Sequence, residues 1–188
     1  MPETRTILQP TRRVVLPPES AADPLEVSQG DVSKPVVLVS PQPRYQVGPG
    51  LWVDYQPESG VETRLTYTSQ ALQIETQSVG NSPWFSLSYD VDLMAAREAR
   101  FMAQIVVSSC ATMARIRSCL RYHLAEGFTD SFARDLIVLT GGASHQQDCI
   151  FMPVDEDLIA QARAVEVLLF FEGRSFDVSL HAIQPFQI

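Results

Sequence analysis

The sequence contains little cysteine and almost no lysine. Its three cysteines, Cys110, Cys119 and Cys149, are odd in number and show no CxxC spacing. Neither a disulfide framework nor a cysteine zinc site is therefore expected, and we interpret all three as reduced thiols. Alternation along its segment places Cys119 on the outward face of a strand, where exposure would make the thiol reactive. Lys34 is the single lysine among 14 basic residues, so the positive charge of this chain is carried by arginine.

Long apolar runs and a positive net charge are also absent. No stretch approaches the ~18 apolar residues of a membrane span, and residues 1–18 lack a run of signal-peptide length. We therefore expect a protein that stays in the cytoplasm at synthesis or leaves the cell inside a larger particle. The formal net charge of −8 excludes a general nucleic-acid binder, which needs a broadly basic surface.

Recognisable catalytic motifs are missing as well. The sequence has no GxSxG elbow, no glycine-rich phosphate loop and no HExxH. Its three histidines, His123, His145 and His181, are far apart and form no HxH pair. We predict no enzyme and no cofactor, with a hydrolase whose carboxylates converge only in the fold as the weaker alternative. Asp90 and Asp92 leave a structural calcium ion open, although loop-side capping is the preferred interpretation.

Proline is concentrated at the N-terminus. Ten of the 13 prolines precede residue 60, and proline removes a backbone donor and restricts φ. Residues 1–49 therefore predict an extended, proline-rich arm or linker, of which residues 35–49 form an arm or an edge strand. Such an arm is either a floppy terminus or docks on a protein partner or on a second copy. Docking predicts an oligomer or a place in a larger assembly such as a phage-like or cell-surface particle.

From residue 50 the pattern changes to short alternating segments that continue to residue 188. Predicted strands cover residues 50–55, 61–68, 71–77, 84–91, 101–109, 113–124, 135–140, 149–153, 164–172 and 176–183. Residues 92–98 and 155–163 predict two short helices, and residues 125–132 predict a loop. Many short strands without long helices between them favour antiparallel sheets. The predicted fold class is an all-β, antiparallel, two-sheet, jelly-roll-like sandwich with one or two short helices.

Arginines gather on one face of the strand predicted over residues 113–124. Strict alternation places Arg115, Arg117, Arg121 and His123 together on the outward side. At ~3.3 Å per residue the three arginines span roughly 20 Å, enough to meet several carboxylates or sulfates of an extended anionic chain. His123 would strengthen such binding as it becomes protonated. The alternative is cross-strand pairing with acids of neighbouring strands, such as Glu62, Glu75 or Asp177.

Both tryptophans also lean outward. Trp84 shares a strand face with Ser86, Ser88 and Asp90, and Trp52 shares one with Asp54. Flat aromatic side chains on an exposed sheet can stack on the C–H faces of sugar rings, whereas a buried tryptophan simply fills the core. The two tryptophans therefore join the candidate binding residues.

The region from about residue 50 to the end resembles a jelly-roll carbohydrate-binding module. The resemblance is carried by WFSLSYDVD at residues 84–92, by the two long strands over residues 101–109 and 113–124, and by the hairpin VLLFFEGRSFDV at residues 167–178. It implies a ligand face on one sheet or at the loop tips. We predict a non-catalytic module that binds glycan, specifically acidic polysaccharide. The alternative is a structural subunit tethered by the arm. The predicted ligand-binding residues are Arg115, Arg117, Arg121, His123, Trp84 and Trp52.

Overall fold

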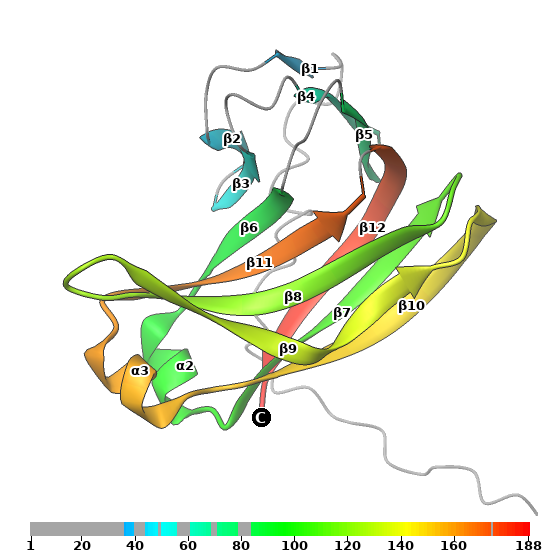
Figure 1. Cartoon of the computed structure of the whole chain (residues 1–188). Helices are drawn as coiled ribbons and strands as arrows, with labels where there is room; N and C mark the ends of the chain where they lie inside the picture. The colour runs from blue at the N-terminus through cyan, green and yellow to red at the C-terminus, as the bar shows by residue number, and fades with distance from the viewer. Residues whose placement is uncertain are drawn as a thin grey trace, which may run out of the picture.

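The computed structural model describes residues 36–39, 44–48, 50–55, 61–68, 71–78, 84–173 and 175–188. These residues form two antiparallel six-stranded sheets that lie face to face (Figure 1). Sheet A has the order β1 (Val36–Val39), β4 (Val61–Tyr67), β5 (Leu72–Ser78), β12 (Ser175–Gln187), β7 (Phe101–Cys110) and β10 (Gly142–Pro153). Sheet B has the order β2 (Arg44–Gly48), β3 (Leu51–Tyr55), β6 (Phe85–Val91), β11 (Ala164–Glu172), β8 (Ala114–His123) and β9 (Phe128–Leu139). The predicted two-sheet antiparallel sandwich is confirmed.

The core lies between the sheets and follows the alternation of the sequence. On β8 the side chains of Ile116, Leu120 and Tyr122 are buried, whereas those of Arg115 and Arg117 are exposed. Successive side chains of a strand point to opposite faces, so one face of β8 joins the core and the other faces away from it. We call the side of sheet B that points away from sheet A its outer face.

Two short helices lie beside one another at one end of the sandwich, α2 (Leu93–Glu98) and α3 (Glu156–Gln161) (Figure 1). Each begins at a capping aspartate, because Asp92 Oδ1 and Asp155 Oδ1 accept hydrogen bonds from the first backbone amides of α2 and α3. Among the described residues, no group of three or more His, Cys, Asp or Glu could hold a metal ion. No helix in the described part of the chain is long and apolar enough to cross a membrane.

The prediction of a loop over residues 125–132 is wrong from residue 128 onward. Strand β9 begins at Phe128, directly after a tight hairpin turn in which Leu124 N donates to Gly127 O. Gly127 has a φ of 90°, a conformation that glycine adopts without steric cost. The polar residues Thr129, Asp130 and Ser131 suggested a loop, but they alternate on a sheet edge whose pairing partner is β8.

In the described part of the chain, two strands precede residue 50, and both lie at sheet edges. β1 pairs only with β4 at the edge of sheet A, and β2 pairs only with β3 at the edge of sheet B. Residues 36–39 and 44–48 are therefore edge strands, which is one of the two alternatives left open for residues 35–49. The arm predicted over residues 1–33 lies outside the described residues.

Candidate ligand-binding face

The outer face of sheet B collects all six predicted site residues. Arg115, Arg117, Arg121 and His123 project from β8, as the alternation predicted. Trp52 comes from β3, and Trp84 directly precedes β6. Strand β11 lies between β6 and β8, so its outward side chains face both groups.

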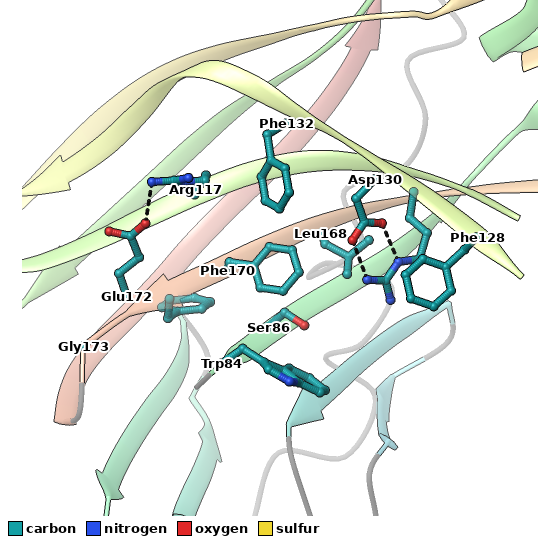
Figure 2. A pocket seen from close by; sticks show the side chains of 12 residues that line it. Trp84, Ser86, Arg117, Phe128, Asp130, Phe132, Leu168, Phe170, Glu172 and Gly173 are labelled. Atoms are coloured by element: carbon teal, nitrogen blue, oxygen red, sulfur yellow. Dashed lines mark hydrogen bonds and ion pairs between the residues drawn. The ribbon is translucent and has the colours of Figure 1, made fainter. Parts of the chain in front are cut away.

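A groove of about 960 Å³ opens on this face, and aromatic side chains line much of it. Trp84, Phe128, Phe132 and Phe170 come from β9, β11 and the segment before β6, and Figure 2 shows them around one hollow. Trp84 is 37% exposed, and the rings of Phe132 and Phe170 lie 5.7 Å apart between centroids. Exposed aromatic side chains in one concave place are typical of a ligand site rather than of a core.

Two ion pairs flank the aromatic group in Figure 2. Arg121 donates to both carboxylate oxygens of Asp130, at 2.7 Å from Nε and 2.8 Å from Nη2. Arg117 Nη2 lies 3.0 Å from Glu172 Oε1. Each guanidinium also lies over a ring, Arg121 at 3.9 Å from the centroid of Phe128 and Arg117 at 5.8 Å from that of Phe132. Both arginines are therefore held in place by a carboxylate and an aromatic face.

Cross-strand pairing of the arginines was the alternative interpretation of this row, and it holds for two of them. The acids involved, Glu172 and Asp130, belong to β11 and β9, whereas Glu75, which the sequence suggested, pairs with Arg64 on sheet A. Among the described residues, no ion pair is formed by Arg115, which is exposed.

The floor of the groove contains a buried hydroxyl without a hydrogen-bond partner. Ser86 is 0% exposed, its Oγ makes no hydrogen bond with any described residue, and Ser86 lies between Trp84 and Phe170 in Figure 2. Buried polar groups are nearly always paired, so this hydroxyl beneath the groove is an exception among the described residues.

Cys119 also faces the groove side of β8, and its exposure, on which its reactivity depended, is absent. Its side chain is 0% exposed, because Phe132 and Leu168 stand opposite it on the two neighbouring strands. Burial, together with the nearby Asp130 carboxylate, raises the pKa of the Cys119 thiol to about 12. A thiol with such a pKa is protonated at neutral pH and is a poor nucleophile.

At the other end of the outer face, Glu166 forms the centre of a second charged group. Its Oε1 accepts a hydrogen bond of 2.6 Å from Arg44 Nη2, and its Oε2 lies 3.2 Å from His123 Nε2. The Arg44 guanidinium lies over the ring of Trp52, 4.5 Å from its centroid. Of the six predicted site residues, Trp84, Arg117 and Arg121 line the groove, whereas Arg115, His123 and Trp52 do not.

Sequence reasoning missed most of the residues that line the groove, among them Phe128, Asp130, Phe132, Phe170 and Glu172. A signal for the first three was present, because they alternate with Thr129, Ser131 and Ala133 as strand residues do. Phe170 and Glu172 were placed on a strand, but both faces of that strand carry apolar residues, so the alternation could not show which side faced the solvent.

No protein-family model matches the chain, and no curated protein matches its sequence. Solved structures share its fold. A family 4 carbohydrate-binding module is 15% identical with a TM-score of 0.58, over 86% of this chain and 99% of that one. The xylan-binding module CBM15 is 11% identical with a TM-score of 0.52, over 82% and 97% of the two chains.

A family 11 carbohydrate-binding module from Clostridium thermocellum, in complex with a β-1,3-1,4-mixed-linked tetrasaccharide, is 11% identical. Its TM-score is 0.50, over 84% of this chain and 98% of that one. Identities this low establish a common fold and nothing finer, because one fold carries many functions. The resemblance inferred from the sequence is confirmed at this level: the chain has the β-sandwich fold of several carbohydrate-binding modules.

Proposed function

We propose that the outer face of sheet B binds a glycan chain in the groove lined by Trp84, Phe128, Phe132 and Phe170. The observation that carries this proposal is the gathering of four aromatic rings, three of them exposed, between two ion pairs in one groove of about 960 Å³. Aromatic rings offer apolar faces to the C–H faces of sugar rings. In this proposal the protein binds the glycan without catalysing a reaction, in keeping with the carbohydrate-binding modules that share its fold.

The polar groups of the groove suit sugar hydroxyls. A hydroxyl both donates and accepts hydrogen bonds, and each ion pair supplies arginine donors beside carboxylate acceptors. Arg121 and Asp130 keep a fixed geometry because two hydrogen bonds join them. A neutral chain can use all of these groups without breaking either ion pair.

We further propose that the bound glycan is an acidic polysaccharide. Arg115 supports it, because this exposed arginine has no acidic partner among the described residues. Arg117 and Arg121 would contact an acidic sugar only by sharing charge with Glu172 and Asp130. An acidic ligand therefore predicts binding that weakens with salt and with Arg115→Ala, whereas a neutral ligand predicts little change from either.

The test is affinity electrophoresis and calorimetry with xylan, mixed-linkage β-glucan and polygalacturonate. Phe132→Ala removes a groove ring that is 47% exposed, and Phe151→Ala removes a ring that is 48% exposed on β10 of sheet A. We expect Phe132→Ala and Trp84→Ala each to weaken binding roughly tenfold or more, because truncating a central aromatic anchor of a binding site costs ~2 kcal/mol or more.

Phe151→Ala serves as the matched control and is expected to bind as the wild type does. Binding of none of the three polysaccharides, followed by a glycan array without a hit, would remove the proposed function. An equal loss in Phe151→Ala and Phe132→Ala would show that binding does not occur in this groove.

A further inference from the structure

Arg44 covers the second tryptophan of the outer face. It lies on the edge strand β2, and its guanidinium carbon is 4.5 Å from the ring centroid of Trp52 on β3. The guanidinium also contacts two carboxylates. Its Nη2 donates to Glu166 Oε1 at 2.6 Å, and its Nε lies 3.7 Å from Asp54 Oδ1. Arg44 therefore extends from the edge of sheet B across β3 and β6 to β11.

Glu166 is built to hold this arginine in place. Its side chain is 7% exposed, its Oε1 accepts the hydrogen bond from Arg44, and its Oε2 lies 3.2 Å from His123 Nε2. A buried carboxylate needs such partners, since its charge is costly without them. The hydrogen bond of Arg44 to Glu166 is short and charge-assisted, so the guanidinium is fixed over Trp52 rather than free to sweep the surface.

Trp52 belongs to the same face as Trp84. Its pairing partner on β6 is Ser88, and Ser88 is four residues from Trp84 along the chain. At ~3.3 Å per residue the two tryptophans are offset by about 13 Å along the strand direction. Two aromatic side chains at such a spacing can both contact one extended chain molecule, provided that both rings are accessible.

We infer that Trp52 is a second stacking position for a glycan and that Arg44, held by Glu166, covers it. The inference rests on the proposed function and adds a determinant of chain length. With Arg44 over Trp52, a bound chain occupies the groove beside Trp84 but does not contact the ring of Trp52. A longer chain reaches Trp52 only by displacing the guanidinium, which breaks its hydrogen bond to Glu166. Arg44 thus makes the face selective for short segments or chain ends.

Whether Arg44 covers Trp52 can be tested by tryptophan fluorescence without any glycan, because the chain has two tryptophans and one of them can be replaced. In Trp84→Phe, Trp52 is the single tryptophan and reports its own accessibility to acrylamide. Adding Arg44→Ala is expected to raise the Stern–Volmer constant of Trp52 and to shift its emission to the red. Glu166→Gln, which removes the charge but keeps the shape, is expected to change both in the same direction by less.

The matched control is Arg64→Ala, which removes an arginine paired at 3.4 Å with Glu75 on the other sheet. It is expected to leave Trp52 quenching unchanged. Circular dichroism and thermal melts verify that each variant is folded. Unchanged Trp52 quenching in both folded variants, Arg44→Ala and Glu166→Gln, overturns the inference.

The second measurement compares xylobiose with xylohexaose, binding to the wild type, Arg44→Ala and Arg64→Ala. Arg44→Ala is expected to gain more affinity for xylohexaose than for xylobiose, and Arg64→Ala to match the wild type. An equal gain for both lengths contradicts the role of Trp52 as a second stacking position. If quenching increases but no probe or arrayed glycan binds, Arg44 does cover Trp52 and the proposed glycan-binding function is wrong.

Discussion

Charged side chains on the outer face of sheet B are mostly paired, and the partner decides what each can do. Arg121 donates two hydrogen bonds to Asp130 and lies over Phe128, so its guanidinium has one orientation. A paired arginine is locally neutral and offers its remaining N–H groups as directed donors. The row of arginines therefore consists of two anchored donors, Arg117 and Arg121, and one unpaired cation, Arg115.

Asp54 shows how burial changes the chemistry of a single group. It accepts a hydrogen bond of 2.8 Å from Ser88 Oγ and lies near Arg44, yet its side chain is only 13% exposed. Burial raises the pKa of Asp54 above its ordinary value of 3.8, because the loss of hydration outweighs the favourable contacts. Protonation of this carboxyl is therefore easier in the folded protein than in the unfolded chain.

This shift has a defined sign for stability. A carboxyl whose folded pKa is raised costs the fold stability as pH rises from 3.8 through the folded pKa, and the cost then persists to neutral pH. The substitution Asp54→Asn removes the ionisation, while the oxygen of the amide side chain still accepts the hydrogen bond from Ser88. We expect the variant to be more stable than the wild type at pH 7 and to lose this advantage below pH 3.8. Urea unfolding between pH 3 and 7 measures the difference, and a less stable variant at pH 7 would show that the ion pair with Arg44 dominates.

At the scale of elements, the two sheets are joined by hydrogen bonds inside the core as well as by apolar packing. Tyr89 OH on β6 donates to Gln104 Oε1 at 2.9 Å, and Gln104 Nε2 donates to Ser118 Oγ on β8 at 2.8 Å. Gln104 itself lies on β7 of sheet A and is 0% exposed. One side chain of sheet A thus connects two strands of sheet B, which aligns the sheets laterally.

Gln104→Leu breaks both of these hydrogen bonds and is expected to lower the free energy of unfolding by about 2–4 kcal/mol, because buried polar partners lose their bonds. Gln147→Leu, at an exposed position of β10 in the same sheet, is the control and is expected to change stability by less than ~0.5 kcal/mol. Adding Ser118→Ala to Gln104→Leu removes one of the hydroxyl groups left unpaired and is expected to recover part of the lost free energy of unfolding. Chemical denaturation measures all three, and wild-type stability in Gln104→Leu would contradict a stabilising role for this network.

In the whole molecule, each described strand from β1 at Val36 onward pairs with another described strand of its own sheet. The first described pairs are those of β1, from Val36 with Leu65 to Val39 with Glu62. The hypothesis that residues 1–33 tether the protein to a partner stays a prediction. It depends on residues outside the described ranges.

Deleting residues 1–33 is expected to leave the sandwich folded, with a melting temperature close to that of the full chain. The tether hypothesis further predicts that the full chain is an oligomer and the truncated chain is a monomer. Circular dichroism measures the first outcome and light scattering coupled to gel filtration the second. An identical mass for both chains would contradict the tether, and an unfolded truncated chain would show that the first 33 residues belong to the domain.

Most strands, though not the first part of β9 or of β10, could be read from the sequence, together with the side chains of β8 that share a face. Alternation is a local property of the backbone, so residues 113–124 were enough to place Arg115, Arg117, Arg121 and His123 on one side. The helix caps Asp92 and Asp155 were equally readable, since a cap acts on amides two or three residues away.

The ion-pair partners and the burial of the outward side chains follow from the tertiary structure and not from the local sequence. Strand order is set by contacts between distant residues, and it brought Glu172 to Arg117, Asp130 to Arg121 and Glu166 to Arg44. The same order buried Cys119 between Phe132 and Leu168 although its parity is outward. Exposure and pairing are properties of neighbours across a sheet, and no local pattern of residues contains them.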